Sequence, residues 1–110
     1  MSYSVSKNKI TMTRGDTAIF KISIDYLTTG DPYIPRKGDV IRFTLKKYLS
    51  DRTALLVKDI LIDTLLLRID SEETAGLPFG RYYYDIQLIR PDGKIDTFIS
   101  DILMLTKEVG

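Results

Sequence analysis

The chain has 110 residues, of which 44% are hydrophobic and 28% charged, and its formal net charge is +1. This length fits one domain, and this composition is typical of a globular fold and unlike that of a disordered chain. The absence of Cys and His excludes disulfides, thiolate nucleophiles, Cys-ligated zinc and the commonest general base, and the near-neutral charge argues against nucleic acid as the main partner.

Alternation of apolar and polar residues with a period of two predicts strands throughout the chain. The first two runs are residues 8–13, with Ile10 and Met12 on one face, and residues 16–24, which begin their apolar face at Ala18. We expect these two runs to form a hairpin that turns at Arg14-Gly15. Residues 26–38 are rich in turn-forming residues and predict a long surface connection, where the chain could pass between sheets.

Three further elements are predicted in the middle of the chain. Residues 39–46 alternate with Ile41, Phe43 and Leu45 inward, and residues 54–60 and 64–70 are expected to form a hairpin that turns at Ile62-Asp63. Asp70 to Gly76 predicts one helical turn, because Asp70 or Ser71 can cap its start and Gly76 can end it.

The last two strands give the clearest pattern. Residues 81–90 carry Tyr82, Tyr84, Ile86 and Leu88 on one face, Pro91-Asp92-Gly93 is a hairpin signal, and residues 94–106 return. The apolar phase of this last run changes along its length, which predicts a bulge near Ser100 and Asp101. Two rings of the run Tyr82-Tyr83-Tyr84 should reach the core, and one hydroxyl should bind the preceding corner.

These elements predict an all-β fold, an antiparallel immunoglobulin-like β-sandwich of about seven strands with one short helical turn, and leave a small barrel as the alternative. We expect a single domain over residues 1–110, with residues 1–7 and 107–110 frayed. The sequence has no apolar stretch of signal-peptide or transmembrane length, so it predicts a protein made in the cytoplasm and no membrane partner.

Motifs of chemistry are few. Arg14-Gly15-Asp16 spells an adhesion tripeptide, but its position between two strands favours a turn. The acidic residues are scattered without a calcium loop or a catalytic pair, and the phosphate-loop, dinucleotide and hydrolase-elbow spacings have no match. We therefore expect no enzyme, no catalytic, cofactor-binding or metal-binding residues, and no small-molecule substrate.

One sheet face is a weaker candidate for ligand binding. Arg42, Lys46, Lys58 and Arg68 could line up there with Tyr83 to stack bases or sugars. Acidic residues within the same strands would interrupt a positive groove, so the pattern is equally that of a solvated sheet face.

Three segments resemble a known group of proteins: Ile10 to Thr17, Gly38 to Lys47 and Thr74 to Ile86. Their turn glycines, corner and alternating strands are similar to small proteins of phage and prophage tail modules in Gram-positive bacteria. They are more distantly similar to the N-terminal domain of phage upper baseplate proteins, which attaches receptor-binding parts to the tail. The resemblance spans about Lys9 to Thr106. Upper baseplate proteins continue into a long further region that this sequence lacks, which favours a small virion or tail-accessory component.

The resemblance implies a non-enzymatic phage or prophage structural or accessory protein that contacts other phage structural proteins, or itself, in a tail or baseplate. Such a protein would reside in the host cytoplasm before assembly and in the virion afterwards. Aromatic and apolar residues of loops often anchor interfaces, so the candidate partner-binding residues are Tyr26, Tyr33, Ile34, Tyr48 and Tyr83. The alternative function is a carbohydrate-binding module for host cell-wall glycans, with Tyr83 or loop tyrosines as stacking platforms.

Overall fold

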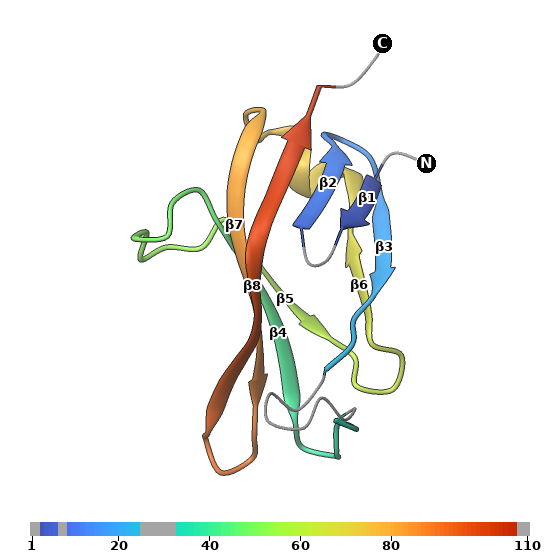
Figure 1. Cartoon of the computed structure of the whole chain (residues 1–110), viewed down its shortest axis with the longest axis vertical. Coiled ribbons are helices and arrows are strands. Elements are labelled where there is room, and N and C mark those ends of the chain that lie inside the picture. The colour runs from blue at the N-terminus through green and yellow to red at the C-terminus, as the bar shows by residue number, and fades with distance from the viewer. Residues whose placement is uncertain (1–2, 7–8, 25–32, 108–110) are drawn as a thin grey trace.

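The structure, a computed structural model, describes residues 3–6, 9–24 and 33–107. It is mostly β, as predicted, with one short helix (Figure 1). No helix within these ranges has the length and the apolar character needed to cross a membrane. The elements in chain order are β1 (Tyr3–Ser6), β2 (Lys9–Thr13), β3 (Ala18–Lys21), β4 (Val40–Lys46), β5 (Leu56–Ile60), β6 (Leu66–Ile69), α1 (Ser71–Ala75), β7 (Gly80–Ile89) and β8 (Ile95–Thr106).

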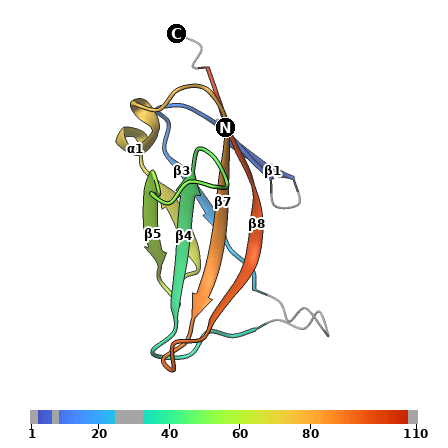
Figure 2. The same cartoon turned by 90° about the vertical axis from the view of Figure 1, so that its left-hand side faces the viewer.

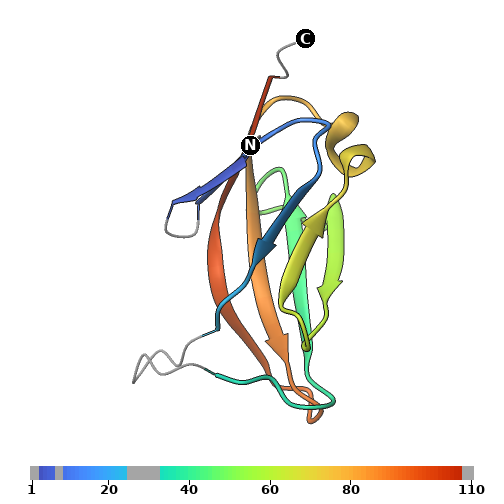
Figure 3. The ribbon, with the colours of Figure 1, turned by 90° about the vertical axis from the view of Figure 1, so that its right-hand side faces the viewer.

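The strands form two sheets that face each other. One has six strands in the order β1-β2-β8-β7-β4-β5, and the other contains only β3 and β6. Figures 2 and 3 show β3 and β6 lying across one face of the larger sheet. The described strands of the larger sheet end in two separate edges, β1 and β5, so they do not close into the alternative small barrel.

The core lies between the two sheets and contains the apolar residues that the alternation placed inward. Phe43, Ile86 and Leu103 of the large sheet and Ile69 of the small one are completely buried. Phe43 also packs against Tyr84, with 5.5 Å between the ring centroids. In both sheets, alternate residues of the strands thus point inward and form one hydrophobic cluster.

The predicted first hairpin is wrong. β2 pairs in parallel with β8, with Ile10 opposite Leu103, whereas β3 belongs to the other sheet. Gly15 has a φ of +83° in the turn after β2, which carries the chain across from one layer to the other. Two strands direct their apolar faces to the core whether they pair as a hairpin or lie in opposite sheets. The alternation of apolar residues therefore cannot distinguish the two arrangements. The large sheet is consequently mixed, and not antiparallel throughout as predicted.

The predicted middle hairpin is also wrong in its pairing. β5 pairs with β4, where Ile60 lies opposite Ile41, and β6 pairs with β3, where Ile69 lies opposite Ala18. The chain does turn at residues 62–64, as predicted, but this turn again passes between the layers. The same physical reason applies, because the inward face of each strand is apolar whichever sheet it joins.

The C-terminal predictions agree better with the structure. The helical turn is α1, capped at Asp70, whose backbone N–H donates to Glu73 Oε1 at 2.8 Å. β7 and β8 form the predicted hairpin, and its register shifts between Ile86 and Gln87, so Phe98 is the extra residue. The bulge therefore lies two to three residues before the predicted position at Ser100 and Asp101.

Part of the N-terminal segment that is predicted to fray, residues 3–6, is a strand in the structure. They form β1, which pairs antiparallel with β2, with Val5 opposite Ile10. The alternation in Tyr3-Ser4-Val5-Ser6 is short but already has the period of a strand. At the other end, Lys107 lies beyond β8, and residues 108–110 lie outside the described residues.

Candidate binding site at the loop end

The elongated molecule has two ends of different construction (Figure 1). We call the end that contains α1, residues 14–17 and residues 76–80 the helix end. The opposite end, which contains residues 33–39, 61–65 and 90–94, is called the loop end. Polar contacts show how each end is held, and exposed side chains show what it offers to a partner.

The adhesion-like tripeptide lies in the helix end and is used structurally there. The Gly15 backbone N–H donates to Oγ1 of the buried Thr74 at 2.9 Å. Arg14 donates to the Leu77 carbonyl at 3.3 Å, and its guanidinium carbon lies 3.9 Å from the centre of the Phe79 ring. This confirms that the tripeptide forms a turn, with Arg14 and Gly15 both engaged by the facing corner.

Tyr82 and Lys58 close the helix end further. The Tyr82 hydroxyl donates to the Pro78 carbonyl at 2.6 Å while its ring is 1% exposed, which confirms the predicted corner bond. Lys58 of β5 bridges the gap between the sheets, since its ammonium group donates to the Arg68 carbonyl and lies 2.6 Å from Glu73 Oε1. This end is therefore occupied by its own contacts.

The loop end contains a pocket of about 390 Å³ between the segment before β4 and the β7–β8 hairpin. Its size falls within the range of small binding clefts. The two walls touch at Gly38, where a Cβ atom would lie 2.9 Å from Pro91 Cγ. The lining residues are Tyr33, Arg36, Lys37, Asp39, Arg90, Pro91 and Asp92.

Both carboxylates of the pocket are engaged by the loops that carry them. Asp39 Oδ2 accepts the Tyr33 hydroxyl at 2.8 Å and the Arg36 backbone N–H at 2.9 Å, and Asp92 Oδ1 accepts the Lys94 backbone N–H at 3.0 Å. The Arg36 backbone bond holds the pKa of Asp39 below its usual value, and burial raises that of Tyr33. At neutral pH the tyrosine is thus the donor and the carboxylate the acceptor.

Arg90 is less well satisfied. One terminal nitrogen lies 3.2 Å from Asp96 Oδ2, and the guanidinium carbon lies 5.7 Å from the centre of the Tyr33 ring. Its Nε atom is buried without a hydrogen-bond partner among the described residues. An unpaired buried donor is uncommon in folded proteins, so this atom marks the pocket as unusual.

Exposed apolar side chains also gather at the loop end. Ile34 is 79% exposed, Leu61 is 72% exposed, and Ile95, which follows the hairpin turn, is 58% exposed. Each belongs to a different segment of the chain, and the fold places all three segments at the same end. Single exposed apolar residues are ordinary, but three at the end of the molecule that also contains a charged pocket are a candidate contact surface.

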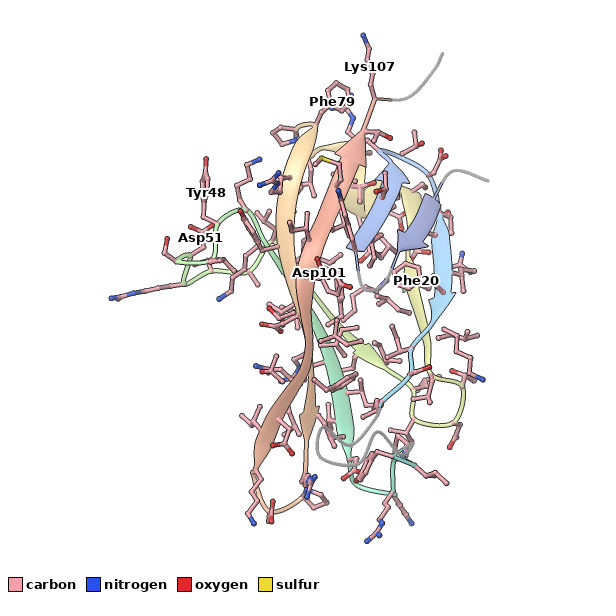
Figure 4. All side chains as sticks on the ribbon, in the orientation of Figure 1. Phe20, Tyr48, Asp51, Phe79, Asp101 and Lys107 are labelled. Carbon is pink, nitrogen blue, oxygen red and sulfur yellow. The ribbon has the colours of Figure 1, made fainter. Side chains whose placement is uncertain are left out.

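The five candidate partner-binding residues predicted from the sequence do not lie together in the structure. Tyr33 and Ile34 lie at the loop end, whereas Tyr48, 61% exposed, lies on the β4–β5 loop that projects from the side of the sheet (Figure 4). Tyr83 is half-buried on the outer face of β7. Tyr26 lies outside the described residues.

Tyr83 borders a second cavity, of only about 60 Å³, which Leu49 and Asp85 also line. Asp85 Oδ1 is buried there without a hydrogen-bond partner in the described part of the chain, and burial raises the pKa of this carboxyl group. Leu49 is 71% exposed, so it contributes more apolar surface than Tyr83 does. The side loop is therefore a second surface, separate from the loop end.

The hypothesis of one basic sheet face is wrong. Arg42 pairs with Asp59 at 2.9 Å on the large sheet, and Lys58 points toward the gap between the sheets. Arg68 lies on the small sheet and pairs with Asp70. Arg42 and Lys46 do share the outer face of β4, where Lys46 lies opposite Tyr83, but Lys58 and Arg68 lie on other surfaces.

Sequence reasoning missed the pocket's cations, Arg36, Lys37 and Arg90, and the exposed residues Leu61 and Ile95. Their position in the sequence could have indicated them, because each lies in or next to a segment rich in turn-forming residues, and loops often carry binding residues. Within the described ranges, no three acidic side chains lie together as metal ligands would. The pocket offers cations, hydrogen-bond donors and apolar borders, which suit binding.

Comparison with known proteins finds no match: no family model fits the chain, and no curated protein and no solved structure is significantly similar to it.

Proposed function

We propose that the chain is a non-enzymatic structural or accessory protein of a phage or prophage tail, which acts by protein–protein contact through its loop end. The observation that carries the contact surface is the contrast between the two ends. Polar groups at the helix end bind one another, whereas the loop end combines three exposed apolar side chains with an unpaired guanidinium nitrogen. Arginine beside apolar residues is a common composition of protein interfaces.

We also propose that the fold is immunoglobulin-like. The order β2-β8-β7-β4-β5 facing β3 and β6 matches strands A, G, F, C and C′ facing B and E. The bond from Tyr82 to the Pro78 carbonyl corresponds to the tyrosine corner at the start of strand F. By this analogy, the β3–β4 and β7–β8 connections correspond to loops that form binding sites in variable domains.

The tail assignment rests on the resemblance of residues 10–17, 38–47 and 74–86 to phage and prophage tail-module proteins. The expected observation is that particles induced from a lysogen carrying this gene contain the protein after purification. Mass spectrometry of those particles tests this. Absence of the protein from intact virions, with the known tail proteins detected, would contradict a structural role.

Surface variants test which face makes the contact. Replacing Ile34 and Ile95 with serine should prevent incorporation into particles without unfolding the chain. The matched control replaces Tyr48 and Leu49 with serine, which removes exposed apolar groups from the side loop instead. Loss of incorporation with the control pair only would move the contact surface to the side loop.

A carbohydrate-binding module is the alternative function, and it has less support. Tyr83, its main stacking candidate, is half-buried beside a small cavity. A stacking platform needs an open ring face. Specific binding on a glycan array that is lost in Tyr83→Ala and kept in Ile34→Ser/Ile95→Ser would favour this alternative over the tail role.

A further inference from the structure

The two walls of the loop-end pocket are held in fixed positions. The Gly38 backbone is close enough to Pro91 to exclude a Cβ atom, and the Tyr33 hydroxyl bound to Asp39 ties the first wall to the start of β4. The second wall is a hairpin turn in which the Arg90 backbone N–H donates to the Lys94 carbonyl at 2.9 Å. The pocket is therefore formed before any ligand arrives, which lowers the entropy cost of binding.

The acidic side chains of the pocket are hydrogen-bonded within the protein, whereas two of its basic side chains are not held in ion pairs by any described residue. Its two carboxylates, Asp39 and Asp92, each accept backbone N–H groups of their own turns. Arg36 and Lys37 are exposed, and among the residues that the structure describes neither side chain forms an ion pair. The acidic groups are thus hydrogen-bonded within their own turns. Asp39 still attracts Arg36 and Arg90 through its charge, but neither Arg36 nor Lys37 is held in an ion pair within the described part of the chain.

Arg90 adds a directed donor to this charge. Asp96 occupies one terminal nitrogen of its guanidinium group, which leaves the buried Nε–H unpaired. A buried donor without a partner is costly. The Arg90 side chain is 39% exposed, so a turn of the guanidinium group toward the pocket would let an acceptor there bind the Nε–H and remove that cost. Carboxylates fit a guanidinium group especially well, since their two oxygens can each accept an N–H bond.

The surroundings indicate where the carboxylate comes from. Ile34, Leu61 and Ile95 are exposed at the same end, and a small free anion would leave all three in water. A protein surface that presents an acidic side chain between apolar ones would bury them together with the charge pair. The net charge of +1 provides no long-range attraction for a polyanion such as nucleic acid or a phosphate-rich wall polymer.

We infer that the loop-end pocket binds a Glu or Asp side chain of the protein partner. Arg90 donates the directed hydrogen bond, and Arg36 and Lys37 add positive charge. Ile34 packs against an apolar residue that lies next to the acidic residue in the partner. This inference rests on the proposed function, because it names the chemistry that the partner in the tail presents.

Nuclear magnetic resonance titration of the full ¹⁵N-labelled chain tests the site. The probe is the peptide acetyl-Ile-Glu-Ile-amide, and its counterpart is acetyl-Ile-Gln-Ile-amide. The Glu peptide should shift the Arg90 Nε–H signal to saturation, and the Gln peptide should bind at least about fivefold more weakly. Equal binding of the two peptides, or shifts confined to other regions, would overturn the inference.

Charge variants sharpen the test. Arg36→Gln/Lys37→Gln should weaken binding of the Glu peptide about fivefold. The matched control Arg52→Gln/Lys21→Gln loses the same net charge from exposed sites elsewhere and should bind as the parent does. Equal weakening by both pairs would show a general charge effect and overturn the site.

Arg90→Lys keeps the charge and removes the Nε–H donor, so it should weaken Glu-peptide binding while Gln-peptide binding stays the same. An unchanged preference for the Glu peptide would overturn the role of Arg90. If this variant does not fold, the Arg36/Lys37 pair decides the test alone. Inorganic phosphate is the second arm, and phosphate that binds more tightly than the Glu peptide would show a general anion site and overturn the assignment to an acidic side chain.

The two proposals fail separately. The peptide titration uses the isolated chain, so a negative result together with protein detected in purified virions overturns the carboxylate site only. A positive titration with no protein in virions overturns the tail assignment and leaves the pocket as a carboxylate site.

Discussion

The helix end and the loop end contain similar groups but use them differently. Each has a tyrosine whose hydroxyl donates to a nearby oxygen, Tyr82 to Pro78 and Tyr33 to Asp39. Each also has an arginine beside an aromatic ring, Arg14 over Phe79 and Arg90 near Tyr33. At the helix end these groups close a corner over the core, whereas at the loop end they border an open pocket. The comparison teaches that burial decides whether a polar contact maintains the fold or remains available to a partner.

The largest effect should separate the two tyrosines. Tyr82→Phe removes the only donor to the Pro78 carbonyl that the described residues provide, so it should lower the free energy of unfolding by about 2 kcal/mol. Tyr33→Phe should lower it by less than about 1 kcal/mol, because water and the Arg36 N–H still solvate Asp39. Urea unfolding measures both variants. A larger loss in Tyr33→Phe would reverse the comparison.

The next effect concerns the contact between the pocket walls. Gly38 has a φ of +97°, and Gly38→Ala adds both backbone strain and a clash with Pro91, so it should cost about 2 kcal/mol. Gly93→Ala is the control, because Gly93 has a φ of +90° with open space around it, and it should cost only about 1 kcal/mol. Thermal unfolding of both variants measures the difference. Equal costs would mean that the walls do not press on each other.

A smaller effect depends on pH. The folded-state pKa of Asp39 lies below the ordinary carboxyl value of 3.8, so its ionised form stabilises the fold above that value. This stabilisation should disappear as the pH falls through the depressed pKa. The parent should therefore be more stable than Asp39→Asn at pH 7, and the difference should shrink as the pH falls below 3.8. Urea titrations over this range measure it, and a difference that grows toward low pH would contradict the assigned sign.

The smallest stability effect should come from the exposed apolar residues of the loop end. Ile34→Ser, Leu61→Ser and Ile95→Ser should each change the free energy of unfolding by no more than about 0.5 kcal/mol, because these side chains are already mostly in water. Calorimetry checks this. Surface substitutions ordinarily change the free energy of unfolding by no more than about 0.5 kcal/mol. A loss of more than about 1 kcal/mol in any of the three variants would therefore show that the residue supports its own loop.

Much of the strand content and the buried face of each strand could be predicted, because both depend on local alternation. Alternation places Tyr82, Tyr84 and Ile86 inward, as the structure does, and caps and turn residues predict α1 and the β7–β8 hairpin. The sheet to which β3 and β6 belong could not be predicted. Their inward residues face the same core from either layer, and the choice depends on long-range contacts such as that between Gly15 and Thr74.

The candidate site was predicted only in part for the same reason. Tyr33 and Ile34 could be predicted because they are aromatic and apolar residues within a turn-rich segment. Arg90 follows the end of β7, more than 50 residues after Tyr33, and no local pattern places it beside Tyr33. Only the two layers, and the strand order within them, bring the two segments together.

The most direct test of the central claim, that the loop end makes the contact, is amine-reactive footprinting of lysines in purified virions and in the isolated chain. Lys37 and Lys94 lie at the loop end, while Lys21 and Lys107 lie elsewhere, and all four are exposed (Figure 4 labels Lys107). Our account predicts that assembly protects Lys37 and Lys94 and leaves Lys21 and Lys107 reactive. Protection of Lys21 or Lys107, with Lys37 and Lys94 still reactive, would contradict it.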